Sequence, residues 1–169
     1  MAEAKEDINK RVIAVIVDNE PGVLARVVGL FSGRGYNIES LTVSEVDPVE
    51  IISRITIVTS GTVMIIEQIK AQLERLVPVH RVADLTGDSV KRELALIKVK
   101  GRGEKRVEAL RIADIFRARV VDSTTRSFVF EMTGSSDKIN AFIDLMTPLG
   151  LVDACRTGVV AIARGPEPL

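Results

Sequence analysis

The order of hydrophobic and polar positions along the chain begins with a strand followed by a helix. Residues 11–18, RVIAVIVD, are β-branched and almost wholly apolar, which is typical of a strand buried in the middle of a sheet. The following stretch, PGVLARVVGLF, carries apolar residues at helical spacing, and the Gly-Arg-Gly at 33–35 ends that helix.

Two alternating segments and a second helix come next. Residues 39–46 and 51–59 alternate polar and apolar positions on either side of a turn, which predicts a β-hairpin with one solvent-facing side. Residues 62–76 place isoleucines and leucines on one stripe of a helix, and 77–85 form a fourth strand. The order β-α-β-β-α-β is that of the ferredoxin-like arrangement.

The same order then repeats. A shift of 74 residues carries Thr59 onto Thr133 and Ile65 onto Ile139. The expected elements of the repeat are a strand at 92–100, a helix at 107–116, a hairpin at 119–125 and 127–133, a helix at 137–146 and a last strand at 152–163. The pattern therefore predicts an α+β protein of two tandem ferredoxin-like βαββαβ units, at 11–86 and 90–165, after a flexible segment at 1–10.

Composition and charge narrow the class of protein. The chain has 169 residues with 23 basic and 23 acidic side chains, so no net positive charge draws it to nucleic acid or to an anionic membrane. Aromatic residues make up 4%, and none lies in the strands at 11–18 and 51–59, which disfavours base stacking on the sheet. No apolar run approaches the roughly 20 residues of a membrane span. With a charged N-terminus and one cysteine, we expect a cytoplasmic protein.

The side chains that carry out catalysis are scarce. His80 is the only histidine and Cys155 the only cysteine, and we expect both to be structural, Cys155 as a small core residue. Nucleophilic catalysis needs a base held by a partner, and a zinc site needs several such ligands. The glycine-rich stretch at 101–105 lacks the ending of a phosphate-binding loop. We therefore expect no catalytic residue, no metal and no cofactor in this chain.

Two short motifs flank the first helix: DNEPGVL at 18–24 and GYNI at 35–38. One interpretation is purely structural. Asn19 or Glu20 would cap the helix, Pro21 would occupy its first position, and the glycines near 35 would end it.

The other interpretation is a small binding site. The amides of Gly22, Val23 and Leu24 would be free at the helix N-terminus, where the dipole favours a carboxylate. Gly22 lets a ligand approach closely, and Asn19 offers an acceptor to an ammonium group. With valine and isoleucine walls, this describes a site for a small aliphatic amino acid.

DNEPGVL together with GRGYNIESL resembles the ACT domain, a sensor of amino acids, and more closely the small regulatory subunits of acetolactate synthase. The similarity runs from about residue 11 to residue 165. It implies a non-catalytic subunit that activates a large catalytic subunit and confers feedback inhibition by valine or another branched-chain amino acid. Thiamine diphosphate, Mg²⁺ and FAD would belong to the large subunit.

The resemblance also implies a homodimer with the effector at its interface. The effector-binding residues carried over are Asn19, Gly22, Val23 and Leu24 of one protomer, facing Asn37 and Ile38 of its partner. Ala25 stands where relatives often carry a hydroxyl or amide. Since the second unit lacks the motif, we expect the first unit to sense the amino acid and the second to help engage the large subunit. The alternatives are a stand-alone amino-acid-sensing protein and, less favoured, a small enzyme on this fold.

Overall fold

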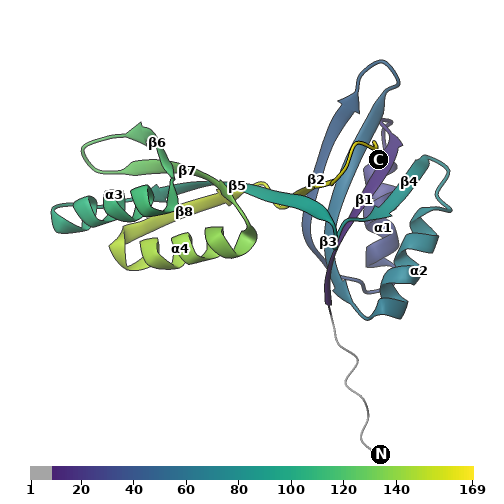
Figure 1. The fold of residues 1–169 in the computed structure, drawn as a ribbon, viewed down its shortest axis with the longest axis horizontal. Coiled ribbons are helices and arrows are strands. Elements are labelled where there is room, and N and C mark those ends of the chain that lie inside the picture. Colours follow the sequence, from purple (N-terminus) through teal and green to yellow (C-terminus); the bar gives the residue numbers. More distant parts are fainter. Residues whose placement is uncertain (1–8) are drawn as a thin grey trace, which may run out of the picture. The chain divides into compact units, whose positions relative to one another are not determined.

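The computed structural model describes residues 9–169, so most of the segment expected at 1–10 lies outside the described residues. Asn9 and Lys10 already belong to the first strand. The chain divides into two compact units (Figure 1). Of the described residues, the first unit contains 9–90 and 159–169, and the second contains 91–158.

The first unit is a four-stranded antiparallel sheet with two helices on one face (Figure 1). The strands are ordered β2-β3-β1-β4, which places β1 and β3 at the centre and β2 at an edge. Its elements in chain order are β1 (Asn9–Asp18), α1 (Val23–Ser32), β2 (Ile38–Asp47), β3 (Ile52–Gly61), α2 (Val63–Leu73) and β4 (Val79–Asp84).

The strand β1 is apolar because both of its faces are buried. Ile13, Val15 and Val17 pack against the helices, in the core that includes buried residues of α1 and α2. The alternate residues, Val12 and Ala14, face the opposite side, as successive side chains of a strand must. There they join a second apolar cluster with Val58, Leu85 and Ala161.

The second unit repeats this topology. Its strand order, β6-β7-β5-β8, places each strand where its counterpart lies in the first sheet, and α3 and α4 supply the core. The predicted pair of βαββαβ units is thereby confirmed. The elements are β5 (Ser89–Val99), α3 (Glu104–Phe116), β6 (Arg119–Ser123), β7 (Phe128–Gly134), α4 (Ser136–Gly150) and β8 (Leu151–Arg156).

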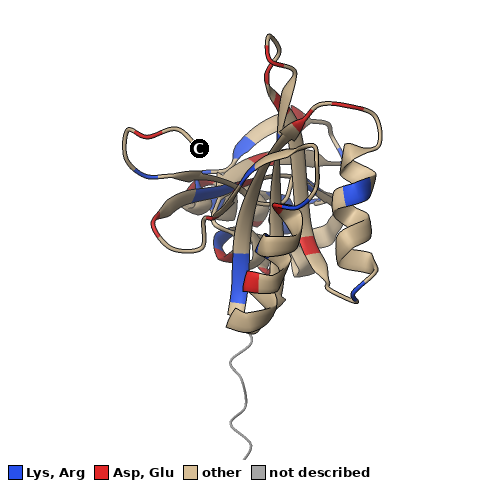
Figure 2. Cartoon of the chain, turned by 90° about the vertical axis from the view of Figure 1, so that its right-hand side faces the viewer, with Lys and Arg blue, Asp and Glu red and all other residues tan. Residues whose placement is uncertain are grey.

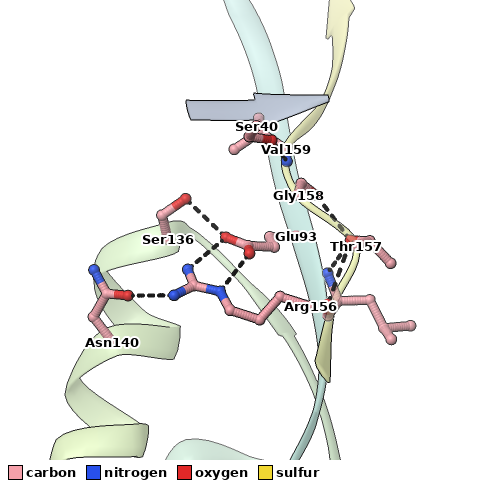
Figure 3. A network of polar contacts seen from close by, with 9 residues as sticks. Ser40, Glu93, Ser136, Asn140, Arg156, Thr157, Gly158 and Val159 are labelled. Carbon is pink, nitrogen blue, oxygen red and sulfur yellow. Dashed lines mark hydrogen bonds and ion pairs between the residues drawn. The ribbon is translucent and has the colours of Figure 1, made fainter. Parts of the chain in front are cut away.

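A buried ion pair holds the second unit together (Figure 3). The Glu93 side chain is 5% exposed and accepts hydrogen bonds from Arg156 at 2.6 and 2.9 Å. Ser136 donates to the same carboxylate at 2.9 Å, and Arg156 also donates to Asn140 at 2.8 Å. The hydrogen bonds that Arg156 donates to Glu93 raise the pKa of the Arg156 guanidinium. The cluster joins β5, β8 and the start of α4.

The last strand differs from the prediction. The segment 152–163, expected to be one strand, forms β8 and a separate β9 (Val160–Ala163). The strand is interrupted between them at Gly158, whose φ of 81° is a left-handed conformation. Residues 159–169 belong to the first unit, whereas the sequence placed residues as far as 165 in the second.

This C-terminal segment, residues 159–169, buries the side of the first sheet that was expected to be polar and exposed. Thr56 and Val58 are 4% and 0% exposed. The half-buried Arg54 donates to the Ala161 carbonyl at 2.7 Å, and burial lowers the pKa of its guanidinium. The alternation along 51–59 was real, but both sides of the strand are covered.

Cys155 is exposed, so its prediction as a core residue was wrong. It lies on β8 opposite Leu96, whose side chain is 40% exposed. Both belong to the sheet face turned away from α3 and α4. Among residues 9–169, none of the helices has the length and apolar character needed to cross a bilayer.

Candidate functional site

The entry to α1 is a tight turn rather than a side-chain cap. Gly22 has φ 86° and ψ −8°, and the amide of Val23 donates to the carbonyl of Glu20 at 3.3 Å. These values describe a type II turn with Pro21 and Gly22 at its centre. Gly22 is the N-cap and no side chain caps the helix. The expectation that Asn19 or Glu20 caps the helix and that Pro21 is its first residue was therefore wrong.

The turn changes which amides are available. The Val23 amide, expected to be free, is used inside the turn. Within residues 9–169, the amides of Leu24 and Ala25 donate to no backbone acceptor, as expected in a first helical turn. A β-carbon built on Gly22 meets nothing within 4 Å, so the space beside Gly22 at the helix entry is open. Val23 is buried in the core and Leu24 is 40% exposed, which leaves Leu24 as an apolar side chain at the surface.

Asn19 lies beside the tip of the β2–β3 hairpin. Its backbone amide donates to the Ile51 carbonyl at 2.7 Å, and its side-chain amide donates to Glu45 at 3.1 Å. Ile51 has φ 54°, a conformation that is strained for a β-branched residue. The hairpin therefore fixes where Asn19 stands, at the cost of local backbone strain.

The histidine lies next to this position. His80 Nε2 is 2.6 Å from Asp18 Oδ1, and both side chains are partly exposed. No hydroxyl or thiol nucleophile is paired with His80 among the described residues. Residues 9–169 also contain no group of three or more His, Cys, Asp or Glu side chains suited to a metal ion.

The other end of α1 closes with a Schellman motif. The Tyr36 amide donates to the Phe31 carbonyl at 3.0 Å, and the Gly35 amide donates to Ser32 at 3.2 Å. Gly35 has φ 70°, as the motif requires. The rings of Phe31 and Tyr36 pack edge to face at 6.5 Å, which is the hydrophobic contact that often accompanies this ending. The glycine at 35 was correctly assigned to a helix end.

The motif then delivers Asn37 and Ile38 to the start of β2. The Asn37 side chain is exposed. The backbone carbonyl of Asn37 accepts a hydrogen bond from the buried Thr59 hydroxyl at 2.6 Å. Ile38 pairs with Thr59 and is half-buried against the first core. The next residue, Glu39, forms an ion pair with Lys10 at 2.7 Å and accepts a hydrogen bond from Ser60.

The structure keeps the two groups of candidate residues apart within one chain. Through Thr59, Ile38 lies in the same row of the sheet as Arg11, whereas Asn19 directly follows Asp18. Seven residues of an extended strand separate Arg11 from Asp18, or about 23 Å. The helix α1, which has one motif at each end, also separates them, because its ten residues span about 15 Å.

Charge near these residues is balanced. Basic and acidic positions are interspersed over the elements of the first unit in Figure 2. Two of the charges in or beside the motifs are paired, Asp18 with His80 and Glu39 with Lys10. At the entry to α1, the donors of Leu24 and Ala25 are backbone amides.

Comparison with known proteins gives consistent matches along the chain. Residues 13–81 match a family model described as an AHAS small subunit-like ACT domain. Residues 92–165 match the model described as the small subunit of acetolactate synthase.

Individual relatives extend these matches over nearly the whole chain. A probable acetolactate synthase small subunit from Archaeoglobus fulgidus is 50% identical over 92% of this chain and 98% of its own. The isozyme 3 small subunit from Escherichia coli is 42% identical over 94% and 98%. The crystal structure of the acetolactate synthase small subunit from Thermotoga maritima aligns with a TM-score of 0.86 at 36% identity, covering 95% of this chain and all of that one.

Proposed function

Because this chain belongs to the family of acetolactate synthase small subunits, we propose that it is the non-catalytic regulatory subunit of such an enzyme. It binds a thiamine-diphosphate-dependent large subunit in the cytoplasm, raises its activity and makes it sensitive to valine. The support is a relative matched over more than nine-tenths of both chains, together with an ACT-type first unit.

The separation of the two motifs supports an effector site formed by two chains. Along the strand direction of one protomer, the row of the sheet that holds Ile38 lies about 23 Å from Asp18, the residue before Asn19. An aliphatic amino acid carries its ammonium and carboxylate on the same carbon atom, so it cannot contact both. In the proposal, Asn19, Gly22, Val23 and Leu24 of one protomer face Asn37 and Ile38 of its partner.

The edge of the first sheet suits such a dimer. The strand β2 is an edge strand, which leaves backbone donors and acceptors available for another chain. Val43 and Val46 on this strand are 41% and 52% exposed. Placing two β2 edges side by side would cover these valines and bring each protomer's Ile38 toward its partner.

The chemistry of the proposed site uses few groups. The effector carboxylate would accept hydrogen bonds from the amides of Leu24 and Ala25, in the open space that Gly22 leaves. The ammonium would donate to an asparagine side-chain oxygen, and Leu24 with Ile38 would contact the aliphatic group. A coupling of about 1–3 kcal/mol between effector binding and dimer packing suffices for strong inhibition.

Titration calorimetry of the chain with valine, leucine and isoleucine tests the effector, and co-purification with the large subunit tests the partner. Gly22→Asp places a negative charge where the carboxylate would lie, and we expect it to weaken valine binding at least about tenfold. Gly22→Asn is the matched control. Asn and Asp tolerate a positive φ comparably, and only Asp adds a charge. If Gly22→Asp bound valine as the wild type does, the site would be misplaced. If the chain did not associate with the large subunit, the regulatory function would fail.

A further inference from the structure

A small cavity in the second unit is lined mainly by cations. Its volume is about 280 Å³, and its walls come from the end of β5, the β5–α3 connection, the β6–β7 loop and β8. The lining residues are Lys98, Lys100, Arg102, Arg126, Ser127 and Val152. Four of the six are basic and none is acidic, although the chain as a whole has no net charge.

These four cations, Lys98, Lys100, Arg102 and Arg126, form no ion pair among the described residues. Three other arginines of the second unit do form ion pairs: Arg156 with Glu93, Arg119 with Glu131 and Arg111 with Glu108. Asp153 stands opposite Lys98 in the β5–β8 register, yet it neither lines the cavity nor pairs with Lys98. Like charges gathered without counter-charges repel each other, and a bound anion would relieve this repulsion.

One wall of the cavity is fixed by a close backbone contact. The Lys100 amide donates to the Gly150 carbonyl at 2.7 Å. Gly150 has φ 108°, and a β-carbon there would lie 2.3 Å from the Lys100 carbonyl oxygen. Only glycine permits this approach, which locks the end of β5 against the end of α4.

A second part of the lining, the β6–β7 loop, is held by hydrogen bonds within the loop and from α3. The Thr124 hydroxyl accepts from the amides of Arg126 and Ser127 at 3.2 and 3.0 Å. Arg106 of α3 donates to the Thr124 carbonyl at 2.9 Å and lies 3.8 Å over the ring of Phe128. The backbone that carries Arg126 is thus set before any ligand arrives, which reduces the entropy lost on binding.

We propose that this cavity binds a small anion that carries phosphate groups. Arginine offers planar pairs of donors that match phosphate oxygens, and lysine supplies a compact charge. Several negative charges in a small volume are needed to balance four cations, which favours a phosphate or diphosphate group over a single carboxylate. The volume lies just below the roughly 300–1,000 Å³ of pockets for drug-sized ligands, so a small anion or the phosphate end of a larger molecule fits.

The test is calorimetric titration of the full chain with inorganic diphosphate at low ionic strength. We expect saturable binding at one site per chain that weakens as salt is added, because screening reduces the attraction. The double variant Lys98→Gln/Arg126→Gln should bind at least about tenfold more weakly. Both side chains are exposed, and circular dichroism verifies that the variant folds.

The matched control is Arg34→Gln/Arg75→Gln, which removes the same charge from exposed positions of the first unit. It should bind diphosphate as the wild type does. The absence of saturable binding, an equal loss in the control, or citrate binding as tightly as diphosphate would each overturn the proposal.

Discussion

The hydroxyl oxygen of Ser40 accepts a hydrogen bond of 2.9 Å from the backbone amide of Val159, across 119 residues of sequence (Figure 3). Ser40 lies on β2, two residues after Ile38 of the proposed effector site. Val159 follows Gly158, the last residue of the second unit. The bond therefore connects β2, the strand that begins with Ile38 of the proposed effector site, to the C-terminal segment 159–169.

Ser40→Ala should release this attachment. Losing one hydrogen bond to a partly buried amide lowers the free energy of unfolding by about 1 kcal/mol, and it should speed hydrogen exchange at the Val159 amide. Exchange measured by NMR checks the effect at that amide. Ser44→Ala, an exposed serine on the same strand, serves as the control. Unchanged exchange at the Val159 amide in the Ser40 variant would show that this amide is not hydrogen-bonded to Ser40 in solution.

The C-terminal segment should stabilise the first unit by covering its sheet. Ala161 is 6% exposed and packs with Val12, Ala14 and Val58, whereas the neighbouring Ile162 is 60% exposed. Ala161→Asp buries a carboxylate among these apolar side chains and should lower the free energy of unfolding by roughly 2–4 kcal/mol. Ile162→Asp should change it by less than about 0.5 kcal/mol, because its side chain points to solvent.

Urea denaturation of both variants measures this difference. Equal stability of the two would mean that the C-terminal segment does not pack on the sheet in solution.

The Glu93–Arg156 pair should be the most sensitive polar contact of the second unit. Glu93→Gln removes the charge that Arg156 faces, and we expect it to lower the free energy of unfolding by about 3 kcal/mol. This value is near the lower end for a buried pair because the Arg156 side chain is one-third exposed. Arg119→Gln breaks a pair whose arginine is 77% exposed, so it should lower the free energy of unfolding much less than Glu93→Gln does. Thermal unfolding of the two variants tests this order, and the reverse order would contradict it.

Acid should weaken the first unit through Glu39. The hydrogen bond from Lys10, followed by that from Ser60, holds the pKa of the Glu39 carboxyl below its ordinary value of 4.5. The unfolded chain therefore binds this proton more readily than the folded one. The resulting stabilisation is complete above about pH 4.5 and is lost as the pH falls through the lowered pKa of the folded state.

Urea denaturation between pH 7 and pH 3 measures this contribution. Glu39→Gln should lose stability at pH 7 and show a shallower decline with acid than the wild type. Glu74→Gln, at the exposed C-terminal end of α2, should keep the wild-type slope. An unchanged slope in the Glu39 variant would show that the Lys10 contact contributes nothing.

Much of the fold could be predicted because its signals are local. The periods of two and 3.6 residues mark the strands and helices, and the 74-residue shift reveals the second unit. The helix entry was misassigned by two residues, because a proline followed by glycine suits a type II turn as well as a first helical turn. The Val23 amide is consequently used in the turn, and the available donors begin at Leu24.

The remaining features depend on contacts between distant residues. No local pattern shows that Glu93 would be buried against Arg156, 63 positions away. The apolar run at 159–163 continued the strand before it, so the interruption of the strand at Gly158 and the packing of Ala161 on the first sheet were not visible. Cys155 was assigned to the core on residue type alone, although its strand turns that side chain outward.

The central claim, an effector site built from two chains, is tested most directly by valine titration of a mixed dimer. One chain carries Gly22→Asp and the other Asn37→Ala, with different affinity tags to isolate the heterodimer. The Asn37 side chain is exposed. The hydrogen bond from Thr59 goes to the backbone carbonyl of Asn37 and not to its side chain, so the alanine variant should fold.

The interface of a two-fold symmetric dimer contains two effector sites. In this heterodimer, one site combines both altered residues and the other combines two unaltered ones. We predict that each variant homodimer fails to bind valine, whereas the heterodimer binds it at one site with wild-type affinity. A heterodimer that binds no valine would contradict a site shared between chains.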